Sequence, residues 1–214
     1  TDGNNCELIE TVTVQQSAGI DVVETITSID CFGENTGAIS LAISGGNAPY
    51  TLEWTDDMGT ILGTTNTLDN LPIGDYQINI RDANNCLQTD IYTISQSPEL
   101  QLNFTEVNNL NCFEVADGNI ELSVIGGDGD YSFEWSNVAN TKDVSLLAAG
   151  TYTVTVTDGL NCTQELSTTL TQPAALSVLD NTSPLSCASI DDGSIQLTVS
   201  GGTSASGTYQ YQWS

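Results

Sequence analysis

The chain has 214 residues, of which 28 are acidic and only two, Arg81 and Lys142, are basic, so its net charge is −26 and it has no His. This charge excludes a protein that binds nucleic acid or anionic membranes, because no basic patch exists to neutralise phosphates. Hydrophobic residues make up 39% of the sequence and recur in regular patterns, which argues against a disordered acidic chain. No apolar run approaches the roughly 18 residues that span a bilayer.

One pattern of Cys, Gly, Tyr and Trp occurs three times, in residues 31–54, 112–135 and 187–213. Each copy opens with a Cys, passes through an alternating apolar stretch to a Gly pair, and reaches a Tyr four residues before a Trp. The Trp residues lie about 80 residues apart, which is too long for a solenoid unit and suits a small independent domain. The repeating unit is therefore predicted to be a domain.

The copies predict four segments in chain order. Residues 1–18 resemble the end of a copy and are expected to be the last strand, strand G, of a preceding repeat. Residues 19–98 and 99–174 are two complete repeats, and residues 175–214 are the first part of a following one. On this interpretation the chain is a window onto a much longer polypeptide.

The repeats are predicted to be all-β, as tandem immunoglobulin-like or fibronectin-III-like sandwiches in a head-to-tail array. Apolar residues alternate with polar ones over residues 39–43, 120–124 and 195–199, and again over residues 76–80 and 152–156, while no helical period is sustained. The Gly pair then joins strands B and C. The expected core residues are the strand C tryptophans and two tyrosine corners at the start of strand F: Trp54, Trp135, Trp213, Tyr76 and Tyr152.

Six Cys at fixed places in the repeats indicate disulfides and an oxidising compartment. Sandwich topology places the two Cys of one repeat at opposite ends, about 25 Å apart, far beyond the roughly 7 Å that a disulfide allows between Cα atoms. The favoured pair therefore joins two repeats, Cys31 with Cys162. The partners of Cys6, Cys86, Cys112 and Cys187 then lie mostly in flanking repeats. Pairs within a repeat (Cys31–Cys86, Cys112–Cys162) and the neighbouring pair Cys86–Cys112 remain alternatives.

Asp and Asn cluster in the turns at both ends of each predicted domain, for example at Asp82, Asn84 and Asn85 and at Asp158 and Asn161. Such oxygen ligands could hold Ca²⁺ at a domain junction. Tight turns favour the same residues without any metal, and no spaced calcium-loop motif is present. No cofactor is therefore expected, with junction Ca²⁺ kept as an alternative.

Nothing in the sequence indicates catalysis. There is no His, and the paired acids at residues 56–57, 128–130 and 191–192 do not recur at matching repeat positions. Carboxylate pairs can cleave glycosidic bonds, but chance adjacency explains these pairs in so acidic a chain. Each Trp ends an alternating strand and is expected in the core rather than on a sugar-binding face. The chain is predicted not to be an enzyme.

The motifs from Cys31 to Cys86, with Gly45-Gly46, Tyr50, Trp54 and a final Asn-Cys, resemble the SprB repeat family. The resemblance covers essentially the whole chain, although Cys112 and Cys187 lack the Gly that stands two residues after Cys31. Repeats of this family occur in giant cell-surface adhesins of gliding Bacteroidetes. The resemblance implies an adhesin filament exported by the type IX secretion system and carried along the cell surface.

The main hypothesis is therefore a structural stalk segment of a long, outer-membrane-associated adhesin. Its partners would be neighbouring repeats, the gliding and secretion machinery and, through other regions, surface polysaccharide or the substratum. The alternative is an accessory tandem module of a large secreted enzyme, and a third interpretation makes the repeats themselves glycan binders.

Overall fold

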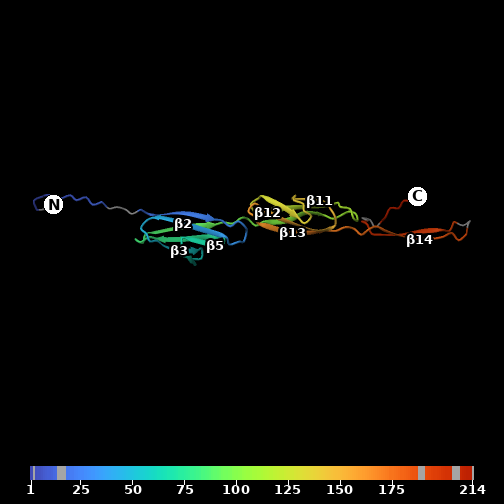
Figure 1. Cartoon of the computed structure of the whole chain (residues 1–214), viewed down its shortest axis with the longest axis horizontal. Coiled ribbons are helices and arrows are strands. Elements are labelled where there is room, and N and C mark those ends of the chain that lie inside the picture. Colours follow the sequence, from blue (N-terminus) through green and yellow to red (C-terminus); the bar gives the residue numbers. More distant parts are fainter. Residues whose placement is uncertain (2, 14–17, 188–190, 204–207, 214) are drawn as a thin grey trace. The chain divides into compact units, whose positions relative to one another are not determined.

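The structure is a computed structural model that describes residues 1, 3–13, 18–187, 191–203 and 208–213. Within these ranges every regular element is a β-strand and no helix occurs. The chain divides into two compact units, Thr1–Gln96 and Ser97–Ser214, and Figure 1 labels several of their strands. The finer boundaries at residues 18, 98 and 174 stay predictions.

Unit 1 contains a sandwich of two antiparallel sheets, with the strand orders β1–β2–β5 and β4–β3–β6–β7. The strands are β1 (Ile20–Thr27), β2 (Gly37–Gly45), β3 (Thr51–Asp56), β4 (Ile61–Gly63), β5 (Thr67–Leu71), β6 (Gly74–Arg81) and β7 (Leu87–Ile94). Beyond β1 the chain crosses to the second sheet, where Ile29 pairs in parallel with Gln96. Two facing sheets of this order are typical of an immunoglobulin-like sandwich.

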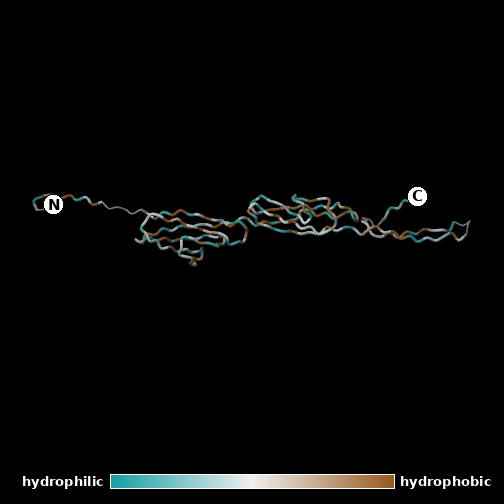
Figure 2. Tube along the Cα trace, in the orientation of Figure 1, coloured by the Kyte–Doolittle hydropathy of each residue, from teal (hydrophilic) through white to brown (hydrophobic). Residues whose placement is uncertain are grey.

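The core of unit 1 is built from alternate residues of the facing strands. Ile39 and Leu41 of β2 and Ile78 and Ile80 of β6 are buried around Trp54 of β3. Hydrophobic and hydrophilic residues alternate along these strands (Figure 2), as expected when one face of each sheet is buried. Burial of this apolar surface is the main term that stabilises the unit.

Unit 2 contains a second sandwich, with the orders β11–β9–β8 and β10–β12–β13. Its strands are β8 (Gln101–Asn108), β9 (Gly118–Ile125), β10 (Tyr131–Trp135), β11 (Val144–Leu147), β12 (Gly150–Asp158) and β13 (Thr163–Leu170). Trp135 lies in its core with Ile120, Leu122 and Val154. The connection from β10 to β11 is shorter than that from β3 to β5, and no strand equivalent to β4 occurs in it. The prediction of tandem all-β, immunoglobulin-like sandwiches is confirmed.

After the sandwich, β14 (Ser177–Ser183) and β15 (Ser194–Ser200) form a two-stranded antiparallel sheet. No second sheet covers it among the residues that the structure describes. Trp213, expected in a core on strand C, therefore differs from its two counterparts: it belongs to no strand and its side chain is 64% exposed. The reason is physical, because a strand C needs a strand F beside it to satisfy its backbone groups.

The amino-terminal segment differs from expectation in the same way. Residues 3–13, predicted as part of a strand G, form no strand, and Leu8, Ile9 and Val12 are exposed. Residues 14–17 of the predicted strand lie outside the described ranges. A lone strand without a hydrogen-bonding neighbour is not stable in water.

Candidate functional site

The turn between β6 and β7 is organised by the buried carboxylate of Asp82. Its Oδ1 accepts hydrogen bonds from the backbone N–H groups of Asn84 (2.8 Å) and Cys86 (2.9 Å). Its Oδ2 accepts one from the backbone of Asn47 (3.0 Å), in the turn between β2 and β3. Asn85 takes φ of 62°, a left-handed conformation that Asn tolerates. One side chain thus fastens two turns at the same end of the sandwich.

These contacts decide the charge state of Asp82. Burial raises the pKa of its carboxyl, but the hydrogen bonds from Asn47, Cys86 and Asn84 favour the charged form and together lower the pKa below its ordinary value. A lowered pKa in the folded state stabilises the fold at all pH values above the unfolded-state pKa, about 3.9. That stabilisation is lost as the pH falls through the folded-state pKa.

We therefore expect the Asp82 turn to open on acidification below about pH 4, because protonation removes the negative charge and weakens the hydrogen bonds from three N–H groups. Hydrogen exchange of peptides covering residues 82–87 and 46–48 measures this opening. In Asp82→Ala, which removes both oxygens, the same peptides should be unprotected already at neutral pH. The control is Asp69→Ala, which changes an exposed acid of β5. Unchanged protection in Asp82→Ala would contradict the assigned role.

The equivalent turn of unit 2, between β12 and β13, is built around Asp158. Its Oδ1 accepts hydrogen bonds from the backbone of Leu160 (3.0 Å) and Cys162 (2.8 Å), as Asp82 does in unit 1. The neighbouring turn differs, because Asp128 stands where unit 1 has Asn47. The Asp128 carboxylate accepts the N–H of Gly159 at 3.0 Å, and the buried Oδ2 of Asp158 has no hydrogen-bond partner.

The opposite end of each sandwich carries the turn that begins with the first Cys of the repeat. In unit 1 the N–H of Gly33 donates to the side chain of Gln96 at 3.1 Å, just beyond β7. In unit 2 the N–H of Glu114 donates to the side chain of Gln172 at 2.9 Å, just beyond β13. Gly33 has φ of 79° and Glu114 has φ of 56°. The missing Gly of the second copy therefore leaves the turn unchanged, with Glu in a conformation that Gly adopts more readily.

The cysteines occupy both ends of each sandwich. Cys31 lies in the Gly33 turn beside Gln96, whereas Cys86 directly precedes β7 at the other end, so the length of β7, about 25 Å, separates them. Cys31 and Cys162 are disulfide-bonded, while Cys86, Cys112 and Cys187 are exposed thiols. Neither pair within a repeat is formed, because each would need Cys86 or Cys112. The pairing of Cys31 with Cys162 stays a prediction, as do the partners of the others; Cys6 is exposed.

The aromatic residues of the repeat have structural contacts. The indole N–H of Trp54 donates to the Thr65 carbonyl and that of Trp135 to the Thr141 carbonyl, each at 2.8 Å, from inside the cores. The Tyr before each Trp donates its hydroxyl to the carbonyl of the first residue of the Gly pair in all three copies: Tyr50 to Gly45, Tyr131 to Gly126 and Tyr209 to Gly201. Neither Trp54 nor Trp135 offers a face to a sugar.

The tyrosines at the start of β6 and β12 form short hydrogen bonds within their own turns. Tyr76 donates to the Pro72 carbonyl at 2.9 Å and Tyr152 to the Ala148 carbonyl at 3.0 Å. This bond, to the residue four positions upstream, is the contact that defines a tyrosine corner. Burial, together with the charges of Asp56 and Asp57, raises the pKa of Tyr76, so its hydroxyl stays protonated at neutral pH.

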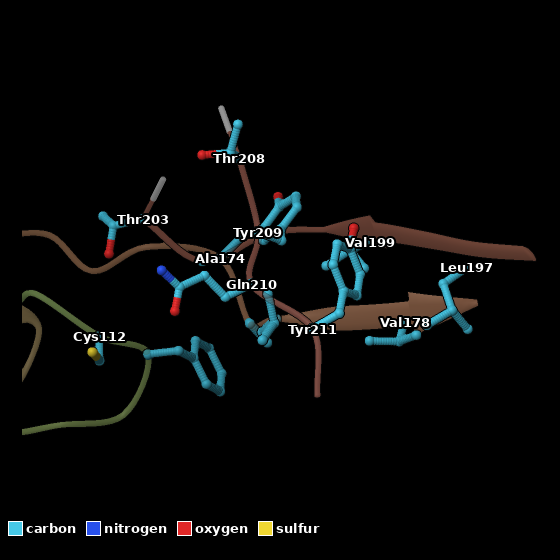
Figure 3. A pocket seen from close by; sticks show the side chains of 14 residues that line it. Cys112, Ala174, Val178, Leu197, Val199, Thr203, Thr208, Tyr209, Gln210 and Tyr211 are labelled. Carbon is cyan, nitrogen blue, oxygen red and sulfur yellow. The ribbon is translucent and has the colours of Figure 1, made fainter. Parts of the chain in front are cut away.

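A groove of about 680 Å³ lies on the two-stranded sheet of unit 2. Figure 3 shows Val178 of β14, Leu197 and Val199 of β15, and Tyr211 lining it. Leu197 occupies the repeat position of the core residues Leu41 and Leu122. The groove is therefore the inner face of an uncovered sheet.

Comparison with known protein families decides what these repeats are. The model of the SprB repeat matches residues 23–59, 105–140 and 179–214, which together make up half of the chain. The chain belongs to the SprB repeat family. Each match begins within the first strand of a copy and extends past its Trp. The SprB repeat matches thus include the Cys turn, the Gly pair and the Tyr–Trp pair described above.

No curated protein matches the chain in sequence. Among solved structures it is similar to three N-terminal domains of the outer capsid protein Hoc of bacteriophage RB49 (14% identity, 89% of this chain and 71% of that chain, TM-score 0.47). It is also similar to the N-terminal eight Ig domains of Down syndrome cell adhesion molecule (10%, 73% and 25%, 0.41). A C-terminal fragment of intimin matches as well (16%, 78% and 67%, 0.39). These similarities are too low to bear on function.

Within the part of the chain that the structure describes, no group of three or more His, Cys, Asp or Glu side chains is placed to hold a metal ion. The same part contains no helix long and apolar enough to cross a membrane.

Sequence reasoning missed one functional feature of the turns, namely that Asp82 and Asp158 are buried acceptors rather than exposed turn residues. A signal was available in the recurrence of an Asp four residues before the second Cys of each repeat. An Asp side chain accepts N–H groups two residues further on, which is the known Asx-turn contact.

Proposed function

We propose that the chain is a structural stalk segment of a long cell-surface adhesin, exported by the type IX secretion system and active in gliding. The observation that carries the proposal is that the residues recurring in the SprB repeats have structural contacts. The Trp of both closed sandwiches fill cores, the Tyr and Asp bind backbone groups, and the glycines allow close turns. A repeat selected for a ligand would be expected to retain exposed side chains instead. Repetition of a self-contained sandwich supplies length.

The disulfide-bonded state of Cys31 and Cys162 supports an extracellular location, since disulfides persist in oxidising compartments. Association with the outer membrane and contact with the secretion and gliding machinery are parts of the proposal. Any contact with polysaccharide or the substratum is assigned to other regions of the adhesin.

The proposal is tested by labelling intact cells with antibodies raised against this chain. Labels spaced along filaments that project from the cell surface are expected, together with loss of gliding when the segment's gene is disrupted. Label found only on a soluble secreted enzyme would favour the accessory-module alternative. Binding of the purified chain to a glycan array would favour the glycan-binding interpretation. Either result would overturn the stalk proposal.

We further propose that a disulfide between Cys31 and Cys162 staples the two complete repeats. Chain connectivity supports it. Gly33, two residues from Cys31, is hydrogen-bonded to Gln96, and Gly127, which abuts the Asp158 turn containing Cys162, is hydrogen-bonded to Pro98 at 3.0 Å. Gln96 and Pro98 are two positions apart in the sequence, and two residues of extended chain span only about 7 Å. Both cysteines therefore lie near the same short linker. A disulfide-carrying oxidant would accept the two electrons and two protons by thiol–disulfide exchange.

We expect a non-reducing peptide map to recover a Cys31–Cys162 peptide. Reduction should leave the melting of each sandwich nearly unchanged, because the bond crosses no core, while the distribution of end-to-end distances in scattering broadens. The matched control is Cys86→Ser, which removes an exposed thiol and should alter neither property. A Cys31–Cys86 peptide, with a loss of about 2–5 kcal/mol on reduction, would contradict the staple.

A further inference from the structure

One carboxylate oxygen in unit 2 lacks the partner that its environment demands. Asp158 is only 4% exposed, and its Oδ2 is buried without a hydrogen bond. A buried charged oxygen that has exchanged water for no other partner is strongly disfavoured. The remaining oxygen, Oδ1, is fully engaged by the N–H groups of Leu160 and Cys162. The turn therefore provides a fixed carboxylate with one unused acceptor.

Unit 1 shows how the same turn is completed when no further group is needed. There Oδ2 of Asp82 accepts the backbone N–H of Asn47 at 3.0 Å. In unit 2 the residue at this position is Asp128, and its backbone N–H makes no such bond to Asp158. Asp128 still has a backbone N–H, so what unit 2 lacks is the hydrogen bond and not the donor. The Asp at this position also brings a second carboxylate to this end of unit 2.

The two carboxylates of unit 2 lie against each other's backbone. Oδ2 of Asp158 lies 2.6 Å from the position that a Cβ of Gly127 would take, and Oδ2 of Asp128 lies 2.3 Å from that of Gly159. Gly127 and Gly159 directly adjoin Asp128 and Asp158, respectively. A Cβ at either position would push the facing carboxylate aside. Oδ1 of Asp128 accepts the N–H groups of Gly159 and Asp130, each at 3.0 Å, which fixes the second carboxylate.

Lys142, the basic residue of unit 2, lies 3.9 Å from Asp143 rather than beside this pair. With a net charge of −26, the surrounding potential attracts cations. Two carboxylates lie at this end of unit 2, and one of them has a buried oxygen without a partner. Together they favour a bound cation.

We propose that Asp158 and Asp128 bind one Ca²⁺ ion at this end of unit 2. The donors are oxygens only, which suits a hard cation, and Ca²⁺ accepts irregular coordination completed by water more readily than Mg²⁺ does. A site with two carboxylates is expected to be weak, with Kd of about 10⁻⁴–10⁻³ M, as in extracellular modules. Unit 1, with Asn47 and a satisfied Asp82, has no equivalent site. The inference goes beyond the stalk role and holds for the purified chain alone.

The test is hydrogen exchange of the full chain with Ca²⁺ added to about 10 mM, well above the expected Kd. Added protection is expected in peptides covering residues 126–131 and 157–163, with none in the equivalent peptides of unit 1, residues 45–50 and 81–87. Asp128→Asn, which reproduces the residue of unit 1, should weaken Ca²⁺ binding at least about tenfold. Glu134→Gln removes the same charge from an exposed position on β10 and should leave binding unchanged.

Three results would overturn the proposal. They are no Ca²⁺-dependent protection in unit 2, an equal response in Asp128→Asn and the parent chain, or equal protection of both units. Because Asp128 is exposed and makes no core contact, its Asn variant is expected to fold.

Discussion

Replacing Trp135 by Ala should unfold the sandwich of unit 2 at temperatures where unit 1 remains folded. Trp135 is 1% exposed, its ring stacks on Phe104 with centroids 6.3 Å apart, and its indole N–H satisfies the Thr141 carbonyl. Truncating a buried Trp costs about 3–5 kcal/mol, and a domain of this size has only about 5–15 kcal/mol in total. The melting temperature of unit 2 should fall by at least about 12 °C.

The chain offers a matched control for this experiment in Trp213→Ala. Trp213 occupies the same position of the repeat, but its side chain is 64% exposed and lies in no closed core. Its removal should change stability by less than about 0.5 kcal/mol. Hydrogen exchange resolved by peptide separates unit 1 from unit 2 in both variants. Equal, small effects of the two substitutions would mean that Trp135 does not hold the core together.

The contrast between these tryptophans also shows what the sequence could predict. Alternation along β2 and β9, at Ile39 and Leu41 and at Ile120 and Leu122, is a local property and was sufficient to predict the sandwich strands. Burial of the Trp is not local, because it requires a second sheet on the opposite side. Trp213 has the local pattern of Trp54 and Trp135 without that sheet, so the sequence pattern alone overestimates its burial.

The turns were predictable in position but not in chemistry. The Asp and Asn residues of the β6–β7 turn were correctly placed in a turn, and the repeat made their recurrence plain. Whether Asp82 is satisfied depends on Asn47, which is 35 residues away in the sequence. The difference between Asp82 and Asp158 therefore lies in a different turn, where the backbone N–H of Asn47 reaches the carboxylate and that of Asp128 does not. A hydrogen bond between two turns that are far apart in the sequence can be recognised only from the folded structure, in which the turns are neighbours.

The Gly pair is the second place where one substitution should have a large effect, and Gly126→Ala is expected to destabilise unit 2 by at least about 3 kcal/mol. Gly126 has φ of 83°, which strains any other residue. A Cβ there would also lie 1.8 Å from the backbone carbonyl oxygen of Glu99, just before β8. Backbone cannot move aside as a flexible side chain would, so the start of β8 would have to separate from β9.

Gly129→Ala separates these two causes, because Gly129 also has a positive φ, 96°, but has nothing within 4 Å of its would-be Cβ. This control should therefore show only the backbone strain, about 1–2 kcal/mol. Thermal melting of unit 2 measures both variants, and exchange of β8 amides shows whether the strand has separated. If Gly126→Ala costs no more than Gly129→Ala, the close approach to Glu99 does not constrain the turn. Gly45 and Gly201 have positive φ as well, and their would-be Cβ atoms face the carbonyl oxygens of Gly19 and Ala175. The same comparison therefore decides for all three copies whether the first Gly of the pair is required by its φ alone or also by the close backbone contact.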